Sequence, residues 1–295
     1  GFIGSHLVER LINQKYEVII IDDLSSGYKN NLPSTQADRL INKQIQNVSF
    51  EEIMNADGIF HLAAQASVPF SIDNFFKSSQ NNLVSTLKVF DWAKKLNIPI
   101  VYASSSAVYG SLPIGDDYQI DYDILSPYAQ DKLTMEHYAL MLFHIYNINS
   151  LGLRFFNVYG PRQDPTNPYS GVISIFIDRI LNKKPVTING GYQTRDFIYI
   201  KDIIDVLMKS MRLLHKKSMC DYINVGTGVS VSVDELLSII ASITNTDPEI
   251  IRKDLPKGDP ERSGGTYEKI SDILNMDINS FYNLKLGLES TFEYF

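Results

Sequence analysis

The sequence predicts an α/β fold built on a doubly wound parallel sheet, followed by a smaller C-terminal α/β lobe. Short apolar runs alternate with amphipathic stretches through the first half of the chain. Two glycines, Gly1 and Gly4, open the first amphipathic stretch, and Asp22 ends the apolar run that follows it. We expect a dinucleotide-binding domain over residues 1–160. A mainly substrate-binding lobe is expected over 161–295, with some segments returning to the first domain.

Apolar residues recur at helical spacing in several stretches. The helices that this periodicity predicts are 4–15, 74–97, 126–148, 172–182, 201–215 and 232–244. Continuous apolar runs predict buried strands at 16–23, 57–64, 98–106 and 150–160. Because strand and helix alternate, the strands are expected to lie parallel and to be joined by right-handed crossovers. The run PRQDPTNPY, 161–169, contains three prolines and predicts a long, functional loop.

Composition excludes several classes of function. Hydrophobic residues make up 44% and charged residues 21% of the 295 residues, as in ordinary globular enzymes. The net charge of −7 argues against nucleic acid or an anionic membrane as the main partner. No apolar run reaches the roughly 18 to 20 residues that a membrane helix needs. The single cysteine, Cys220, and five scattered histidines predict no disulfide and no metal site, and favour the reducing cytoplasm.

The glycines and Asp22 together predict a cofactor site. Glycines at a helix start allow a phosphate to approach the backbone, but the pair alone is a weak signal. Asp22 lies 18 residues after Gly4, close to the spacing at which an acid binds the adenosine ribose of a dinucleotide. A carboxylate there would repel the 2′-phosphate of NADP, which favours NAD. The alternative for Asp22 is a solvated turn, which would not explain the glycines.

Tyr128 and Lys132 form the stronger catalytic signal. At positions i and i+4 of the predicted 126–148 helix, the phenol and the ammonium share one face. A neighbouring cation is expected to lower the phenol pKa from its usual value near ~10, which would make Tyr128 a usable base. The serines of SSSAVYG, 104–110, end a predicted strand, where ligands of parallel sheets bind. The alternative is a surface Tyr–Lys pair beside a polar turn.

The motifs GFIGSH, HLAAQASV, SSSAVYG, YAQDK, LRFFNVYGPRQ and QTRDFIYI, in this order and with Asp22, resemble the extended short-chain dehydrogenase/reductase family. Within it, the chain is most similar to NAD-dependent nucleotide-sugar 4-epimerases of the UDP-glucose and UDP-N-acetylglucosamine type. The likeness spans essentially the whole chain. It implies a Rossmann-type domain whose glycine fingerprint resembles T-G-G-x-G-F-I-G. Gly1 and Gly4 match its last two glycines, so we expect the first β-strand to be missing from a truncated sequence.

The resemblance implies which residues hold NAD. Gly1 and Gly4 would lie along the pyrophosphate, at the positive end of the first helix. Asp22 would bind the adenosine ribose, and Lys132 the nicotinamide ribose. The other NAD contacts that it implies are Phe2, Ile3, Leu24, Ser26, Gly27, Leu62, Ala63, Ala64, Gln65, Asn81, Tyr128 and Phe156.

The family's catalytic and substrate residues match this sequence as well. Ser105, Tyr128 and Lys132 would be catalytic, with Tyr128 taking the proton of the sugar C4 hydroxyl. Arg195 would grip the nucleotide diphosphate, although a local Arg195–Asp196 ion pair is the alternative. The remaining substrate contacts that the resemblance implies are Ser67, Ser105, Asn157, Val172, Thr187, Asn189 and Asp259.

Two departures from the family pattern stand out. Gln44 replaces an aspartate that binds adenine, so an altered adenine contact is expected. Near the C-terminus Asp259 aligns, but Pro256 stands where the family has a basic residue, so the substrate lid is expected to differ.

The turn after the 98–106 strand separates the possible reactions. Family dehydratases resemble T-D-E-V-Y-G there, and decarboxylases usually keep the glutamate, whereas this chain has Ser105, Ser106 and Ala107. We therefore expect C4 epimerisation through a transient 4-keto sugar. Ser263 leaves room for an N-acetyl group, which favours UDP-N-acetylglucosamine/UDP-N-acetylgalactosamine, with UDP-glucose/UDP-galactose close behind. A 4,6-dehydratase, a decarboxylase and a UDP-glucuronate epimerase stay open.

Two further expectations concern the whole protein. A catalytically silent NAD-binding regulatory protein is the alternative of another class, although it would have no need of an activated phenol. Family members commonly pair through two helices each, here 74–97 and 126–148, so a homodimer is expected. The resemblance implies a role in supplying polysaccharide precursors.

Overall fold

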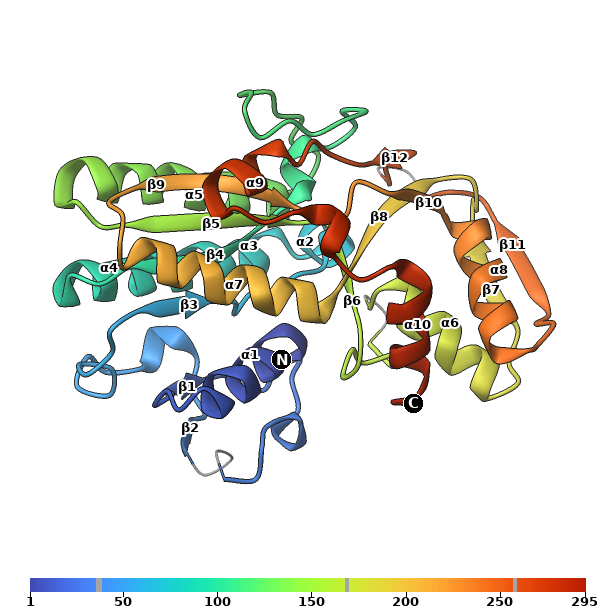
Figure 1. The fold of residues 1–295 in the computed structure, drawn as a ribbon, viewed down its shortest axis with the longest axis horizontal. Helices are drawn as coiled ribbons and strands as arrows, with labels where there is room; N and C mark the ends of the chain where they lie inside the picture. The colour runs from blue at the N-terminus through green and yellow to red at the C-terminus, as the bar shows by residue number, and fades with distance from the viewer. Residues whose placement is uncertain (36–38, 168–169, 257–258) are drawn as a thin grey trace. The chain divides into compact units, whose positions relative to one another are not determined.

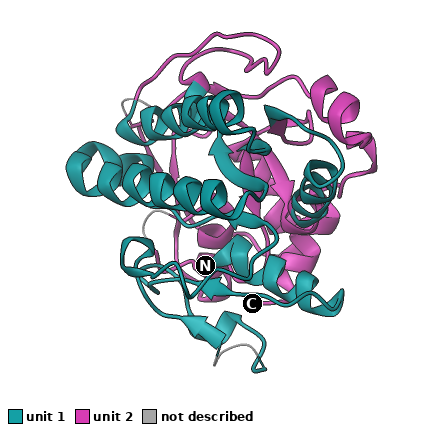
Figure 2. Ribbon diagram, turned by 90° about the vertical axis from the view of Figure 1, so that its left-hand side faces the viewer, with its two compact units in different colours: residues 1–108, 126–154, 204–223 teal, residues 109–125, 155–203, 224–295 magenta. Residues whose placement is uncertain are grey.

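The computed structural model describes residues 1–35, 39–167, 170–256 and 259–295, so Pro168 and Tyr169 of the predicted long loop lie outside the described residues. The chain divides into two compact units (Figure 2). Unit 1 comprises residues 1–108, 126–154 and 204–223, and unit 2 comprises 109–125, 155–203 and 224–295. Compared with a single division at residue 160, segment 109–125 lies in the second unit and segment 204–223 in the first.

Unit 1 is built on a four-stranded sheet with helices packed on its strands, which confirms the predicted α/β, Rossmann-like class (Figure 1). Its order is β3-β4-β5-β9. These strands are β3 (Ile59–His61), β4 (Ile100–Ser105), β5 (Ser150–Phe155) and β9 (Cys220–Val225), the last two of which run on into unit 2. A separate parallel pair consists of β1 (Ile20–Ile21) and β2 (Leu40–Ile41).

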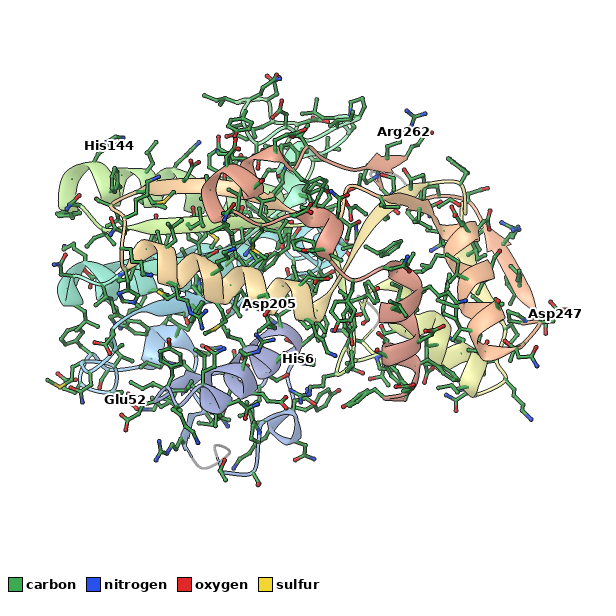
Figure 3. All side chains as sticks on the ribbon, in the orientation of Figure 1. His6, Glu52, His144, Asp205, Asp247 and Arg262 are labelled. Atoms are coloured by element: carbon green, nitrogen blue, oxygen red, sulfur yellow. The ribbon has the colours of Figure 1, made fainter. Side chains whose placement is uncertain are left out.

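The helices of unit 1 follow the predicted periodicity except in one region. They are α1 (Phe2–Asn13), α2 (Val68–Asp73), α3 (Phe75–Ser79), α4 (Ser85–Leu96), α5 (Pro127–Tyr146) and most of α7 (Ile200–Leu214). The predicted helix 74–97 is confirmed by continuous helical backbone from α3 to α4, with a π-helical turn, Gln80–Val84, between them. A non-helical Asn74 (φ −130°) separates it from the additional helix α2. On α1, Arg10 pairs with Asp205 of α7, which is labelled in Figure 3.

Helix α5 begins and ends at defined residues. The Ser126 hydroxyl accepts a hydrogen bond from the Ala129 backbone N–H at 3.2 Å, and Pro127 occupies the first helical position. At the other end, Asn147 adopts a left-handed conformation (φ 56°) that stops the helix. The apolar face of α5 packs on β4 and α4 in the main core of unit 1. The buried residues of this core are Phe90, Ala93, Ile100, Tyr102, Met135, Ala139, Leu142 and Ile148.

Unit 2 contains two small sheets. In the first, β8 (Thr194–Tyr199) pairs with β10 (Ser230–Ser232), β12 (Arg262–Ser263) and β6 (Asn157–Tyr159). In the second, β7 (Val186–Asn189) and β11 (Ile250–Lys253) pair in parallel. The helices of this unit are α6 (Val172–Leu181), α8 (Val233–Thr244), α9 (Glu268–Leu274) and α10 (Leu284–Phe292). Short 3₁₀ turns of the two units lie at Lys29–Asn31, Ile45–Asn47, Ser106–Tyr109 and Ile278–Ser280.

The prediction of one strand over 150–160 is wrong. The segment forms β5 and β6, which belong to different sheets. The Phe156 backbone N–H still donates to the Val225 carbonyl at 3.1 Å, but from Asn157 onward the chain pairs with β8 instead. An apolar run cannot reveal this change of partner, because both strands are buried and equally apolar.

In the part of the chain that the structure describes, no helix is both long enough and apolar enough to span a bilayer.

Candidate active site

The start of α1 and the end of β1 form the candidate NAD site. Asp22 Oδ2 lies 2.9 Å from the Gly1 amino nitrogen, and Oδ1 accepts a 2.8 Å hydrogen bond from the Leu24 backbone N–H. Gly27 approaches Gly1 so closely that a Cβ on Gly27 would lie 2.8 Å from the Gly1 nitrogen. The structure thus brings together four residues that the sequence assigned to one cofactor.

This site fits a dinucleotide. A Cβ built on Gly1 or Gly4 would meet no atom within 4 Å, so open space adjoins the first turn of α1. The backbone N–H groups of a first helical turn have no partners within the helix, and they carry partial positive charge. Both properties suit a pyrophosphate, and the Asp22 carboxylate suits ribose hydroxyls.

A second cofactor segment, Leu62–Gln65, follows β3 and is held by Asn82. The Gln65 backbone N–H donates to Asn82 Oδ1 at 2.8 Å, and Asn82 Nδ2 donates to the Gln65 carbonyl at 3.1 Å. Asn82 Nδ2 also lies 3.4 Å from Asp131 Oδ2 on α5. Asn82 is only 1% exposed, whereas the predicted residue, Asn81, is half-buried.

The sequence analysis missed Asn82 for a definable reason. Asn81 and Asn82 are adjacent and of the same type, so only the helical register distinguishes them. They lie on the π-helical turn Gln80–Val84, which shifts the register by part of a turn. No periodicity measured for a regular α-helix indicates which asparagine holds the Gln65 backbone, and the assignment of Asn81 to NAD stays a prediction.

The three predicted catalytic residues lie together in unit 1. Ser105 ends β4, and its hydroxyl acts on the Tyr128 side chain at the start of α5, where it lowers the phenol pKa. Lys132 Nζ lies 5.6 Å from the centre of the Tyr128 ring and donates to the Ala103 carbonyl at 2.6 Å. All three catalytic side chains are less than 10% exposed. A serine, a phenol and an ammonium at these distances can move a proton to or from a bound hydroxyl group.

The expected effect of Lys132 on Tyr128 is wrong for the protein alone. Burial raises the pKa of Tyr128, and the hydrogen bond with Ser105 offsets this only in part. Burial also lowers the pKa of Lys132 to about 8, against the charges of Asp131 and Glu136. Tyr128 therefore holds its proton at neutral pH. Lys132 loses part of its positive charge as the pH rises from 7 toward 8.

His61 ends β3 and lies near Lys132. Its Nε2 is 2.9 Å from Thr86 Oγ1, and the Thr86 hydroxyl donates to the Asn82 carbonyl at 2.7 Å. Since the Thr86 proton is used there, Nε2 carries the imidazole proton and donates it to Thr86. Burial and the nearby charge of Lys132 lower the pKa of His61 to about 3, so the ring is neutral.

Arg195 of β8 pairs with Asp259 and not with its neighbour Asp196. Arg195 Nη2 donates to Asp259 Oδ1 at 2.5 Å, and Nη1 donates to the Thr194 carbonyl at 2.9 Å. Arg195, which the sequence assigned to the substrate diphosphate, and Asp259, assigned to substrate binding, are thus brought together in unit 2. Asp259 directly follows residues 257 and 258 of the altered lid motif, which lie outside the described residues.

Asp196 points to other groups. Its carboxylate accepts hydrogen bonds from the Thr227 backbone N–H at 2.9 Å, from the Gly228 N–H at 2.8 Å and from the Tyr267 hydroxyl at 2.5 Å. Its carbonyl accepts from Asn157 Nδ2 at 3.1 Å. The local Arg195–Asp196 ion pair is therefore wrong, and Asp196 fastens the loop after β9.

The other predicted residues have local roles in the protein alone. The Ser67 hydroxyl caps α2 by accepting from the Phe70 backbone N–H at 3.1 Å. The Phe156 ring packs edge-on against Tyr267, with ring centres 5.5 Å apart. Val172 is the first residue of α6 and is half-buried. Thr187 and Asn189 lie on the exposed side of β7.

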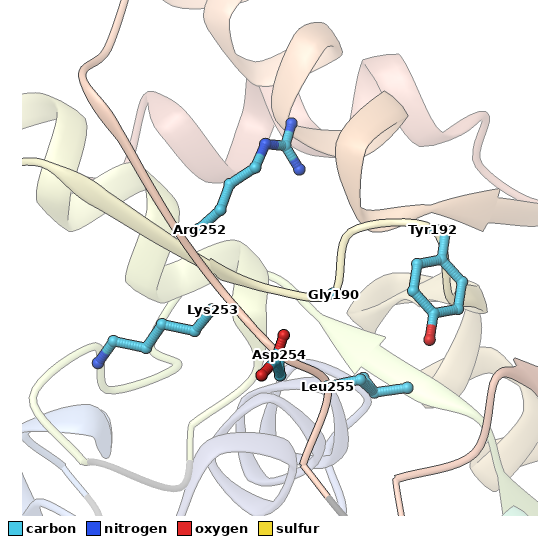
Figure 4. A pocket seen from close by; sticks show the side chains of 6 residues that line it. All are labelled: Gly190, Tyr192, Arg252, Lys253, Asp254 and Leu255. Carbon is cyan, nitrogen blue, oxygen red and sulfur yellow. The ribbon is translucent and has the colours of Figure 1, made fainter.

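A cavity of about 500 Å³ lies in unit 2 beside the end of β7 (Figure 4). Its lining residues are Gly190, Tyr192, Arg252, Lys253, Asp254 and Leu255. It adjoins Asn189, whose register partner on β11 is Lys253. None of the residues assigned to catalysis lines it.

Known proteins are similar to this chain in sequence and in fold. Residues 1–226 match the sequence model of the NAD-dependent epimerase/dehydratase family. The chain is 32% identical over its whole length to a UDP-glucose 4-epimerase of Mycolicibacterium smegmatis, 96% of which is covered.

Two solved structures are similar over the whole chain. A UDP-N-acetylglucosamine 4-epimerase from Methanobrevibacter ruminantium, in complex with UDP-N-acetylmuramic acid, is 35% identical and superposes with a TM-score of 0.91 over 94% of its length. A UDP-glucuronic acid 4-epimerase from Bacillus cereus, in complex with UDP-glucuronic acid and NAD, is 29% identical with a TM-score of 0.88 over 96% of its length.

The role of Asp22 can be tested by Asp22→Asn. An amide still accepts from Leu24 but no longer offers a charged acceptor to ribose hydroxyls, so we expect the Kd for NAD to rise about tenfold or more. Titration calorimetry measures this change. Asp23→Asn is the matched control, because Asp23 Oδ1 accepts only from Ser25 of its own turn. Equal losses in both variants would contradict the assignment.

His61 makes stability depend on acid pH. A folded-state pKa of about 3 lies below the unfolded value near 6.5, so its contribution is complete above about pH 6.5 and is lost as the pH falls toward 3. From pH 7 to pH 5 we expect His61 to reduce the free energy of unfolding by about 2 kcal/mol. Urea denaturation should show that His61→Gln removes this loss.

The control is His144→Gln, which changes an exposed imidazole at the far end of α5 (Figure 3). It is expected to keep the pH dependence of the unmodified protein. A His61→Gln variant with that same pH dependence would show that the buried ring is already charged at pH 5.

Proposed function

The chain belongs to the NAD-dependent epimerase/dehydratase family, and from this premise we propose that it is an enzyme that epimerises C4 of a UDP-sugar. The observation that carries the proposal is the buried group of Ser105, Tyr128 and Lys132, in which the Lys132 ammonium lies 5.6 Å from the centre of the Tyr128 ring. Conversion of a C4 hydroxyl to a ketone requires removal of its proton, which a tyrosine accepts in its phenolate form when a neighbouring ammonium stabilises that form.

The proposed roles follow from the contacts of each residue. The Ser105 hydroxyl holds the C4 oxygen and relays the C4 hydroxyl proton to Tyr128 Oη in its phenolate form, and Tyr128 returns the proton when the hydroxyl forms again. The Lys132 ammonium stabilises the phenolate while it exists. The first turn of α1, Asp22 and the Leu62–Gln65 segment would hold NAD. When bound, NAD supplies the acceptor and donor of the C4 hydride, so that a transient 4-keto sugar can be reduced on its other face.

The turn after β4 favours epimerisation over dehydration. Loss of water across C5 and C6 needs an additional acid and base. Ser106–Tyr109 forms a 3₁₀ turn with no carboxylate in it, and the Ala107 backbone N–H donates to Ser105 Oγ at 3.1 Å. The turn supports the orientation of Ser105 and supplies no second acid.

Arg195 is proposed to bind the UDP diphosphate, because its planar fork matches phosphate oxygens. Its present partner, Asp259, is 42% exposed and can turn toward water when a stronger anion arrives. Ser263 of β12 is the register partner of Arg195. A small side chain at that place supports UDP-N-acetylglucosamine/UDP-N-acetylgalactosamine as the substrate pair, with UDP-glucose/UDP-galactose next and UDP-glucuronate after it.

A homodimer formed through α4 and α5 is also proposed. Val89, Phe90, Leu133 and Leu142 are buried within unit 1 and belong to its core. Other apolar side chains stay on the surface of these helices. They include Val84, directly before α4, and Tyr138 and Ile145 on α5, which are 46%, 36% and 64% exposed.

The proposed reaction is tested by incubating the protein with UDP-N-acetylglucosamine and following the sugar by proton NMR. We expect the galacto isomer to appear. Tyr128→Phe should reduce the rate by at least about a hundredfold, because it removes the proton acceptor. Tyr146→Phe, a change of the same atom at an exposed position of α5, is the control and should retain the rate.

Two other outcomes would change the conclusion. A 4-keto-6-deoxy product would establish a dehydratase instead. If UDP-N-acetylglucosamine, UDP-glucose and UDP-glucuronate all stay unchanged while NAD binds, the silent regulatory protein would be the better description.

A further inference from the structure

Helix α5 is fastened to the sheet of unit 1 by charged groups at two successive turns. In the first, Lys132 Nζ donates to the Ala103 carbonyl of β4. In the second, Glu136 Oε1 accepts from Ser104 Oγ at 2.6 Å and from Arg154 Nε at 2.9 Å. Glu136 Oε2 accepts from Arg154 Nη2 at 2.6 Å. Adjacent residues of β4 therefore bond residues one turn apart on α5.

This ion pair is fully desolvated. The Arg154 side chain is 0% exposed and that of Glu136 is 2% exposed. On β9, the ring of Tyr222 lies against the guanidinium, 3.8 Å from its central carbon. An apolar pair of similar volume usually stabilises a core as well as a buried ion pair does. Stability alone is thus a weak reason for these charges, whereas a two-point fork fixes the direction of both side chains.

We infer that Glu136 is a positioning residue for catalysis: held by Arg154 and Ser104, it fixes the turn of α5 that carries Lys132 and places a negative charge one turn from that ammonium. The inference rests on the proposed function, since it assumes that Tyr128 and Lys132 perform the chemistry. Glu136 touches neither residue's reactive atom, so it acts through the place and the charge of Lys132.

The charge of Glu136 acts on the pKa of Lys132 in a known direction. Burial lowers the pKa of Lys132 to about 8, and the charges of Asp131 and Glu136 oppose that effect. Removing the charge of Glu136 should therefore lower this pKa further. The titratable and charged groups that surround Lys132 and Glu136 are His61 on β3, Tyr102 on β4, Tyr128 and Asp131 on α5, Arg154 on β5, and Cys220, Asp221 and Tyr222 on β9.

Glu136→Gln tests the inference in the complete protein. The amide keeps the shape and the acceptor oxygen but loses the charge and one half of the fork. We expect kcat to fall about tenfold while KM for the sugar nucleotide stays within about twofold, because orientation rather than binding is lost. The basic limb of the kcat profile should move by roughly one unit to lower pH.

Glu52→Gln is the matched control (Figure 3). It makes the same atomic change in an ion pair, with Lys43 Nζ 2.8 Å away, but at a half-exposed surface position of unit 1. It should leave kcat and the pH limb unchanged. A purely structural weakening of the fold would alter the denaturation midpoint of Glu136→Gln without moving the basic limb, and that result would overturn the inference.

A second variant covers the case in which an unpaired Arg154 prevents folding. The double change Glu136→Met and Arg154→Met removes both charges of the pair, so neither is left buried without its partner, and the variant is expected to fold. It should show the same lowered kcat and shifted limb. A folded double variant with unchanged kcat and unchanged pH profile would overturn the inference.

A readout without substrate separates this inference from the proposed reaction. NMR of protein labelled with ¹³C at lysine Cε follows the titration of Lys132, with Lys132→Met identifying its signal. A titration that moves to lower pH in Glu136→Gln but not in Glu52→Gln supports the inference even if no sugar nucleotide is turned over, in which case the proposed function fails alone. An unmoved titration in an active enzyme overturns the inference alone.

Discussion

Burial of charge against the β3-β4-β5-β9 sheet is the constraint on which the site depends. A charged group that leaves water must gain hydrogen bonds of good geometry, and few positions of a helix on a sheet provide them. Lys132 finds the Ala103 carbonyl, and Glu136 finds Arg154 and Ser104. Apolar contacts alone would tolerate small shifts of α5, because volume-conserving packings differ little in energy. The charged contacts do not tolerate such shifts, so they fix the position of α5 and, with it, of Tyr128.

The same reasoning extends from α5 to the cofactor side of the sheet. Neutral His61 donates to Thr86, Thr86 donates to the Asn82 carbonyl, and the Asn82 side chain holds both polar groups of the Gln65 backbone. Asn82 also reaches Asp131, the residue before Lys132. A loop without regular structure is thereby tied to α5 through satisfied polar groups, which rigidify a site more than apolar contacts do.

Many of the site residues could be predicted from the sequence. There are physical reasons why the others could not. The spacing of Tyr128 and Lys132 is a helical repeat and needs no tertiary information. Spacing alone could not select Asn82, because a π-helical turn shifts the register. Nor could it reveal that burial raises the pKa of Tyr128, since the depth of a side chain depends on every element around it. The partner of Arg195 escaped because Asp259 is 64 residues away in sequence.

The Arg195–Asp196 dipeptide shows how a strand can separate anchoring from binding. Successive side chains of a strand point to opposite faces, so these two charges cannot share partners. Asp196 is 1% exposed and is satisfied by Thr227, Gly228 and Tyr267, which makes it a fixed part of unit 2. Arg195 is 12% exposed, and the side chain of its partner Asp259 is 42% exposed. An ion pair with an exposed carboxylate contributes little to stability, so exchange of Asp259 for a diphosphate would cost the protein little free energy. The diphosphate would also bring a second negative charge to the same guanidinium group.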